Sequence, residues 1–237
     1  FLTLFVALSL WASPTLLPTQ SNSQFFIENK GQWNKDALYL ARLNGLNYWI
    51  TKNGVVSDYI RIEDTANYED PRTIEDPDLP QKRKIYGHVI KTTLLDLNQD
   101  FAVRPDGIKE GYFNYIIDND PSKWQTYVHL YSSVKLENIY KGIDVIYYYT
   151  PDNQIRYDYY IAPNSDPSQI RMKFEGQDGL ELAPNGDLVF KTSLGDIAHG
   201  KLFAYQEVNG TQQQITCNFK IIDNNVVTFQ ISNYDKS

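Results

Sequence analysis

The densest run of strand-forming residues lies between Tyr140 and Ile170, and it constrains the fold more than any other stretch. Val145 to Tyr149 and Gln154 to Ile161 are β-branched or aromatic at most positions, as is typical of strands. Between them stands Thr150-Pro151-Asp152-Asn153, which combines a proline with two residues that tolerate left-handed backbone. The stretch therefore predicts a β-hairpin with a four-residue turn.

A four-residue turn also sets the register of this hairpin. The pairs it predicts are Tyr149 with Gln154, Tyr147 with Arg156, and Val145 with Asp158. Because side chains alternate between the faces of a strand, the remaining positions share the other face. We expect that apolar face to be buried, and it comprises Ile146, Tyr148, Ile155, Tyr157, Tyr159 and Ile161.

Similar short strands, including one at Gly111 to Ile117, recur along the chain between turn signals. Asparagine-glycine pairs, which favour tight hairpin turns, occur at 44–45, 53–54, 185–186 and 209–210. No convincing period of 3.6 residues follows residue 24. The sequence predicts an all-β, antiparallel β-sandwich with minimal helix, built as one large sandwich or two consecutive sandwich-like subdomains.

Two breaks suggest how this sandwich is divided. Residues 63–81 are rich in Asp, Glu, Pro and Thr, which indicates an exposed acidic loop, and Lys82-Arg83-Lys84 balances its charge. The turn-rich Asp118 to Trp124 is the candidate internal boundary. We expect residues 24–118 to form a first sandwich half or subdomain and residues 119–237 a second.

The first 23 residues have the pattern of a secretory signal peptide. An apolar run from Phe1 to Ala12, too short to span a bilayer, precedes the small residues Ser21-Asn22-Ser23. No Met or basic residue precedes the run, so we interpret this leader as truncated at its start, with Gln24 opening the mature chain. A lipid-anchored or uncleaved segment is the alternative, but no cysteine lies near Ala12 or Ser23. We expect a secreted or cell-surface protein without a transmembrane segment in its mature part.

The charge composition limits the classes of binding partner that we expect. The net charge is −7, with 22 Lys and Arg against 29 Asp and Glu, which argues against nucleic acid and anionic membranes as binding partners.

Cys217 is the single cysteine and alternates with the apolar Ile215, Phe219 and Ile221, so we expect it to be buried and inert. The fold must therefore rely on its core rather than on an internal disulfide.

No catalytic constellation emerges from the motifs. His88, His129 and His199 are widely separated, and the sequence has no nucleophile elbow and no glycine-rich phosphate loop. Asp144 and Asp158 lie on adjacent predicted strands, where two carboxylates would suit a glycosidase. The predicted register speaks against this role, because Asp158 lies beside Arg156 on the same face, where an ion pair explains it, and Asp144 follows Gly142 at the start of a strand. We predict no catalytic residues.

Two sets of residues are candidates for binding. Trp33, Trp49 and Trp124 can build a sugar-stacking platform, although aromatic residues in strands more often pack in the core. Asp118 and Asp120 form an oxygen-rich turn that suits a calcium ion, but their spacing is not that of an EF-hand. A turn followed by proline needs no metal, and no other cofactor is expected.

Several motifs resemble an uncharacterised N-terminal all-β domain that precedes SBBP-type β-propeller repeats in large secreted or surface proteins of Gram-negative bacteria. The residues that carry the resemblance are 26–33, 111–115, 119–124, 140–144, 166–170, 179–180, 186–188 and 205–207. The resemblance implies an all-β module in a longer exported polypeptide, with the downstream propeller repeats as its neighbours. It supplies no activity and no catalytic residues, and it implies that this chain is a fragment.

These observations favour a non-catalytic, extracytoplasmic structural or adhesive module at the N-terminus of a larger secreted or cell-surface protein. A carbohydrate-binding module that uses exposed aromatic residues is the alternative. A glycoside hydrolase-like enzyme acting through Asp144 and Asp158 is a third hypothesis. The expected partners, beyond the repeats of the same polypeptide, are a glycan or a surface protein.

Overall fold

The computed structural model describes residues 2–9, 24–65, 82–208, 210–232 and 234–236. Its strands, in chain order, are β1 (Leu2–Ser9), β2 (Phe26–Glu28), β3 (Ala37–Leu43), β4 (Leu46–Thr51), β5 (Gly54–Thr65), β6 (Lys82–Leu94), β7 (Ala102–Ile108), β8 (Phe113–Tyr115), β9 (Gln125–Val128), β10 (Leu130–Tyr140), β11 (Ile143–Tyr149), β12 (Ile155–Ile161), β13 (Met172–Glu175), β14 (Gly179–Leu182), β15 (Leu188–Lys191), β16 (Ile197–Val208), β17 (Thr211–Ile215), β18 (Cys217–Asp223) and β19 (Val226–Ile231). The helical content of the described residues is two short 3-10 turns, η1 (Pro121–Lys123) and η2 (Pro167–Gln169). The all-β prediction is confirmed.

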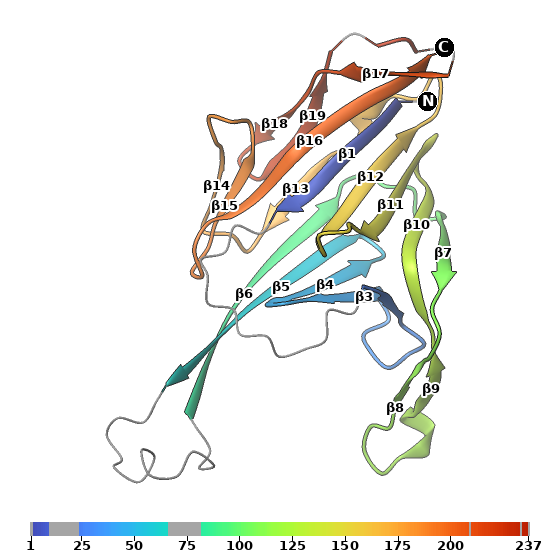
Figure 1. The fold of residues 1–237 in the computed structure, drawn as a ribbon, viewed down its shortest axis with the longest axis vertical. Coiled ribbons are helices and arrows are strands. Elements are labelled where there is room, and N and C mark those ends of the chain that lie inside the picture. Colours follow the sequence, from blue (N-terminus) through green and yellow to red (C-terminus); the bar gives the residue numbers. More distant parts are fainter. Residues whose placement is uncertain (1, 10–23, 66–81, 209, 233, 237) are drawn as a thin grey trace.

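The strands form an antiparallel sandwich. Within the described residues, seventeen strands join into one continuous sheet, while β8 and β9 form a separate ribbon. Figure 1 shows how the sheet folds over itself, with β16, β1, β12, β11, β10 and β7 in one layer and β3 to β6 in the layer that faces it. The layers are joined through β10, which pairs with β11, β7 and β2.

The two halves separated by the predicted boundary share one core. Strands β2 and β7 of the first half pair with β10 of the second, and β6 pairs with β13. The largest cluster of buried residues draws on both halves, from Phe26 to Phe229. Residues 24–118 and 119–237 thus contribute to one core in this structure, while the division of the chain at Asp118 to Trp124 stays a prediction.

The central hairpin exists, but its predicted register is wrong by one residue. Tyr147 pairs with Tyr157 and Val145 with Tyr159, because the loop contains five residues rather than four. Thr150 closes this loop, since its N–H donates to the Gln154 carbonyl at 2.9 Å and its Oγ1 accepts from the Gln154 N–H at 3.1 Å.

The slip turns over one strand of the pair, because neighbouring side chains point to opposite faces. On β12 the expected residues are buried, namely Ile155, Tyr157, Tyr159 and Ile161. On β11 the buried residues are instead Ile143, Val145 and Tyr147. Ile146 and Tyr148, which we expected to be buried, are half-buried on the outer face.

The acidic loop is shorter than predicted. Strand β5 continues to Thr65 and β6 starts at Lys82, so that Glu63 lies opposite Lys84 in the ladder. Opposite charges across a strand pair stabilise it, which agrees with charge balance as the role of the basic cluster. The rest of the predicted loop, residues 66–81, lies outside the described residues.

The predicted leader contributes a strand to the fold. Leu2–Ser9 forms β1, which lies between β12 and β16 and pairs with both. The other residues of the leader, 1 and 10–23, lie outside the described residues, and its cleavage stays a prediction. In the part of the chain that the structure describes, no helix has the length and apolar character needed to cross a membrane.

Cys217 is less buried than we expected. It opens β18 and is partly buried, packing against the core together with Ile215 and Ile221. This burial raises the pKa of the Cys217 thiol to about 12, so the reactive thiolate is not formed at neutral pH.

Candidate functional site

A projecting hairpin is a distinct feature of the described surface. Strands β8 and β9 form a ribbon that extends away from the two layers (Figure 1). The ribbon pairs Phe113 with Val128 and Tyr115 with Gln125, with an irregularity between them. Residues 111–128, which include the intervening loop and η1, are called the arm below.

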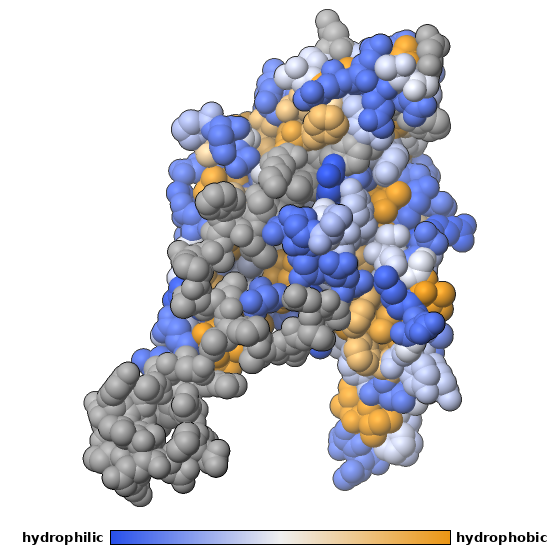
Figure 2. Space-filling view, in the orientation of Figure 1, coloured by the Kyte–Doolittle hydropathy of each residue, from blue (hydrophilic) through white to orange (hydrophobic). Residues whose placement is uncertain are grey.

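The arm carries a concentration of exposed apolar side chains. Their exposed fractions range from 37% to 58%, and Figure 2 shows apolar surface over this part of the molecule. We call them the arm patch, and they are Tyr112, Phe113, Ile116, Ile117, Trp124 and Tyr127. Contiguous exposed apolar surface is typical of interaction sites, whereas scattered apolar residues are ordinary.

Aromatic contacts fix the base of the arm to the sandwich. Tyr115 of β8 meets the ring of Trp33, with centroids 5.4 Å apart, and Phe113 meets Phe25 at 5.8 Å. Trp33 in turn contacts Trp49 of β4 at 5.0 Å. The rings of Phe25, Trp33, Trp49 and Tyr115 pack against a second buried cluster, which is made of Ile27, Leu40, Val128 and Leu130. The arm is therefore held at its root by a core of its own.

The three candidate tryptophans are only partly brought together. Trp33 and Trp49 are half-buried and meet edge to face, with 88° between their ring planes, so they do not form one flat stacking surface. Trp124 lies on the arm, 37% exposed, and its Nε1 donates to the Asp118 carbonyl at 3.1 Å. Trp124 alone among them belongs to the arm patch.

The polar turn next to Trp124 is organised by its own side chains. Asp120 caps η1 by accepting hydrogen bonds from the Ser122 N–H at 3.0 Å and the Ser122 Oγ at 2.7 Å. These two bonds hold the pKa of the Asp120 carboxyl below its usual value.

Lys123 is the cation nearest to the two candidate calcium ligands. Its Nζ lies 3.7 Å from Asp118 Oδ2 and 3.9 Å from Asp120 Oδ2. The described residues contain no group of three or more His, Cys, Asp or Glu side chains that suits a metal ion. Calcium binding at Asp118 and Asp120 stays a prediction.

The carboxylates considered for glycosidase chemistry are both engaged with cations. Asp158 is 1% exposed and accepts from Tyr148 Oη at 2.8 Å and from Arg156 Nε at 2.9 Å. Burial raises the pKa of Asp158, against the opposing effects of Tyr148 and Arg156. Asp144 forms an ion pair with Lys135 at 2.8 Å. The predicted pairing of Asp158 with Arg156 is confirmed.

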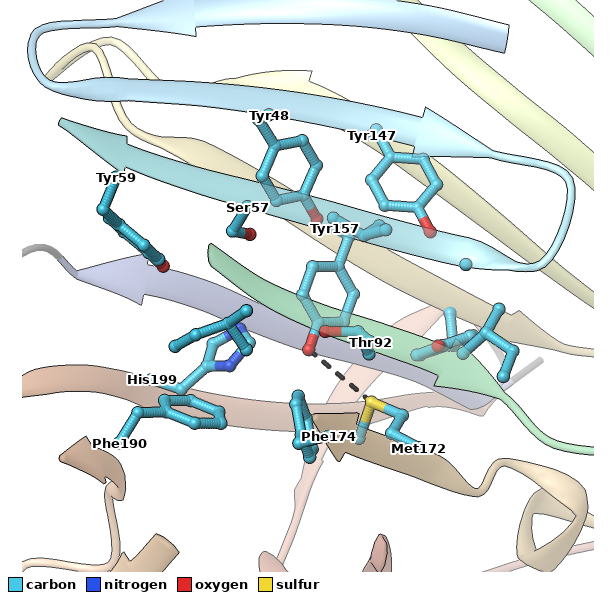
Figure 3. A pocket seen from close by; sticks show the side chains of 15 residues that line it. Tyr48, Ser57, Tyr59, Thr92, Tyr147, Tyr157, Met172, Phe174, Phe190 and His199 are labelled. Atoms are coloured by element: carbon cyan, nitrogen blue, oxygen red, sulfur yellow. Dashed lines mark hydrogen bonds between the residues drawn. The ribbon is translucent and has the colours of Figure 1, made fainter. Parts of the chain in front are cut away.

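A tyrosine-lined cavity lies between the layers of the sandwich (Figure 3). Its polar lining includes Tyr48, Tyr147, Tyr157 and Tyr159 together with Ser57, Tyr59, Thr92 and His199. Burial raises the pKa of each of these five tyrosines, which keeps their hydroxyls neutral. The free volume is about 30 Å³, enough for one or two water molecules and well below the 300 to 1,000 Å³ of a typical ligand pocket.

His199 is the most isolated polar group in this cavity. It is 6% exposed, and neither ring nitrogen has a hydrogen-bond partner among the described residues. Burial lowers the pKa of His199 to about 3, so the ring is neutral at physiological pH. His199 is thus not hydrogen-bonded to Ser57, as a serine nucleophile and its base would be.

Sequence reasoning found Trp124 but missed the rest of the arm patch. The stretch Gly111 to Ile117 was interpreted as one more strand, whereas only Phe113–Tyr115 is paired. Its apolar residues do not alternate with polar ones, since 112, 113, 115, 116 and 117 are all apolar. Because successive side chains point to opposite faces of a strand, this run places apolar residues on both faces of the ribbon. The continuous apolar run is therefore the sequence feature that could have indicated an exposed apolar surface.

The fold and the arm define an all-β sandwich domain with a projecting aromatic hairpin. Residues 26–237 match the model of a family described as a domain of unknown function, DUF7948, and the chain belongs to that family. Neither the curated proteins nor the solved structures contain a match to the chain.

Proposed function

We propose that this domain is a non-catalytic structural or adhesive module of an exported protein and that it contacts its partner through the arm patch. The observation that carries the proposal is the arm itself, which places six large apolar side chains in solvent on a hairpin held at its root. Covering such a patch with a partner removes apolar surface from water, which stabilises the complex at about 25 cal/mol per Å².

The extracytoplasmic setting rests on the sequence. The apolar start of the chain has the pattern of a secretory leader, and the motifs resemble a domain found before SBBP-type propeller repeats in exported bacterial proteins. In that setting the neighbours of this domain are propeller repeats of the same polypeptide, and the partner of the arm is a surface protein.

A carbohydrate-binding role is the second candidate. The observation that favours it is the exposed ring of Trp124 beside the polar turn that holds Asp118, Asp120 and Lys123. Aromatic rings stack on the apolar faces of sugars, and neighbouring carboxylates accept hydrogen bonds from hydroxyls. The half-buried pair of Trp33 and Trp49 contributes less, because its rings are perpendicular.

The test is binding of the full chain to an array of matrix proteins, bacterial surface proteins and glycans. One double variant, Ile117→Ser with Tyr127→Ser, removes apolar residues from the arm, where they are 44% and 58% exposed. The matched control is Leu182→Ser with Ile222→Ser, which are 43% and 46% exposed elsewhere.

The proposal expects a protein signal that the arm variant loses and the control keeps. A glycan signal that Trp124→Ala abolishes would favour the second candidate. A signal that both double variants keep, or a silent array with a folded chain, would contradict a role for the arm in adhesion.

A further inference from the structure

Strand β1 occupies a slot between two strands that are not paired with each other in the described pairings. On one side Leu2 to Ala7 pair with β12, and on the other side Leu2 to Ser9 pair with β16, both in antiparallel orientation. A bulge in β16 falls between the partners of Phe5 and Ala7. The slot thus offers main-chain hydrogen-bonding groups from both walls to a single extended segment.

The walls of this slot are part of the hydrophobic core. Tyr159 and Ile161 of β12 and Ala204 of β16 are each 1% exposed, and Leu2 at the mouth is 2% exposed. The register places Leu2 opposite Ile161, and Leu4 opposite both Tyr159 and Ala204. Since every second position of a strand faces the same side, an occupant needs an apolar residue at alternate positions.

The mouth of the slot is built from ordered polar contacts. The Gln206 side chain accepts a hydrogen bond from the Asp235 N–H at 2.9 Å and donates to the Asp235 carbonyl. The Asn164 N–H donates to the Lys236 carbonyl at 2.7 Å. These contacts and Leu2 line a small pocket at the end of β12 and β16, which defines where an entering strand begins.

The residues that fill the slot, Leu2–Ser9, lie within the apolar run of the predicted leader, which extends from Phe1 to Ala12. Removal of a leader during export would take β1 away from the domain. Two strand edges would then carry unpaired main-chain groups beside an uncovered core, and such an edge readily pairs with another strand. An exported domain of this design needs a replacement for β1.

We propose that the slot between β12 and β16 is a strand-binding site for an extended segment of a partner polypeptide. The segment is about eight residues long, uncharged, and apolar at alternate positions, and it runs antiparallel to both walls. Residues 2–9 of this chain meet that description and fill the site in the structure. The site becomes vacant only if the leader is removed during export, so this part of the inference rests on the proposed function. The capacity of the site to bind a strand does not depend on export. Addition of a strand to open edges is a known mode of peptide recognition.

The experiment uses the full chain with a site for a specific protease placed between Ser23 and Gln24. After cleavage, a fluorescent peptide with the sequence of residues 1–10 and two added lysines for solubility is titrated in. We expect it to bind by replacing the cleaved leader. A peptide with proline at the positions of Leu4 and Val6 should bind at least tenfold more weakly, because proline lacks the N–H donor that a strand needs.

A cross-link locates the peptide. With cysteine at the position of Thr3, it should form a disulfide with a Tyr160→Cys chain, because these positions are paired, and not with a Tyr148→Cys chain on β11. If the cleaved chain unfolds when the leader leaves, the peptide should restore the fold and the proline peptide should not.

Equal binding of both peptides, no binding, or no site-specific cross-link would overturn the strand-binding site. The premise that the leader is removed during export is tested separately, by measuring the mass of the chain recovered from cells that express it with an export signal. A mature chain that retains residues 2–9 would contradict processing, and so the vacancy, while leaving the in vitro binding result intact.

Discussion

Aromatic residues play opposite parts in two regions of this molecule. In the sandwich, Tyr147, Tyr157 and Tyr159 alternate with outward-facing residues and are at most 5% exposed. On the arm, Tyr112 and Tyr127 are 48% and 58% exposed, although their ring centroids are only 4.5 Å apart. The same side chain is core where an opposing layer covers it and surface where the ribbon has none. The number of aromatic residues in a segment therefore does not identify an interaction surface. What identifies it is whether another layer of the fold packs over those residues.

The largest effect that this contrast predicts is on stability. Tyr159→Ala removes a fully buried ring that packs against Tyr157 and Phe229, and we expect it to lower the free energy of unfolding by about 4 kcal/mol. Tyr127→Ala on the arm should lower it by less than about 1 kcal/mol. Urea denaturation followed by fluorescence measures both. Equal losses would show that the arm is part of the cooperative core.

The pH dependence of stability should expose the buried histidine. The pKa of His199 is about 3 in the folded chain against 6.5 when unfolded, so the unfolded state binds more protons between these values. Stability is then complete above pH 6.5 and falls as the pH drops toward 3, with a loss of about 2 kcal/mol between pH 7 and pH 5.

Denaturation at several pH values with a pair of variants isolates this effect. His199→Phe should remove this part of the pH slope, whereas His88→Gln on β6 should keep it. A His199→Phe chain with the wild-type slope would refute the assignment.

A smaller effect is expected at the polar network on the outer face. Tyr148→Phe removes one of the donors to the buried carboxylate of Asp158, and we expect a loss of about 1 to 2 kcal/mol. The companion Asp158→Asn keeps the shape and weakens the interaction with Arg156. A double-mutant cycle over Tyr148 and Asp158 gives their coupling, and a coupling of zero would contradict the hydrogen bond.

The smallest effect on stability is expected on the arm. Ile117→Ser with Tyr127→Ser should change the unfolding free energy by about 0.5 kcal/mol or less at each site, because both side chains are largely in solvent. Binding of hydrophobic dyes should fall, since the arm patch is then smaller. A large destabilisation would mean that these residues pack against the body and do not form a free surface.

The sequence predicted the strand content and half of the central hairpin, and its failures have physical causes. Strand β12 was assigned its correct buried face because its alternation is clear. Strand β11 was turned over because Gln154 belongs to the loop that Thr150 closes, which no propensity indicates. One residue in a loop thus decided the orientation of a whole strand.

The site was harder to predict than the fold. Trp33 and Trp49 are exposed in part and Trp124 more so, but which aromatic residues lack a covering layer depends on contacts between distant segments. The role of Leu2–Ser9 as a strand was likewise not predicted, because its nearly continuous apolar run also fits a leader. Contacts between segments that are distant in the sequence, and not the local residue pattern, decide which aromatic residues are exposed and whether Leu2–Ser9 forms a strand.

The most direct test of the account is hydroxyl-radical labelling of the chain on the cells that our proposal expects to display it, compared with the purified full chain. If the arm patch is the contact surface, oxidation of Tyr112, Trp124 and Tyr127 should fall severalfold on cells. Tyr86, which is 36% exposed on β6, is the reference and should label equally in both samples. Equal labelling of the arm aromatics on cells and in solution would contradict the central claim that a partner covers the arm.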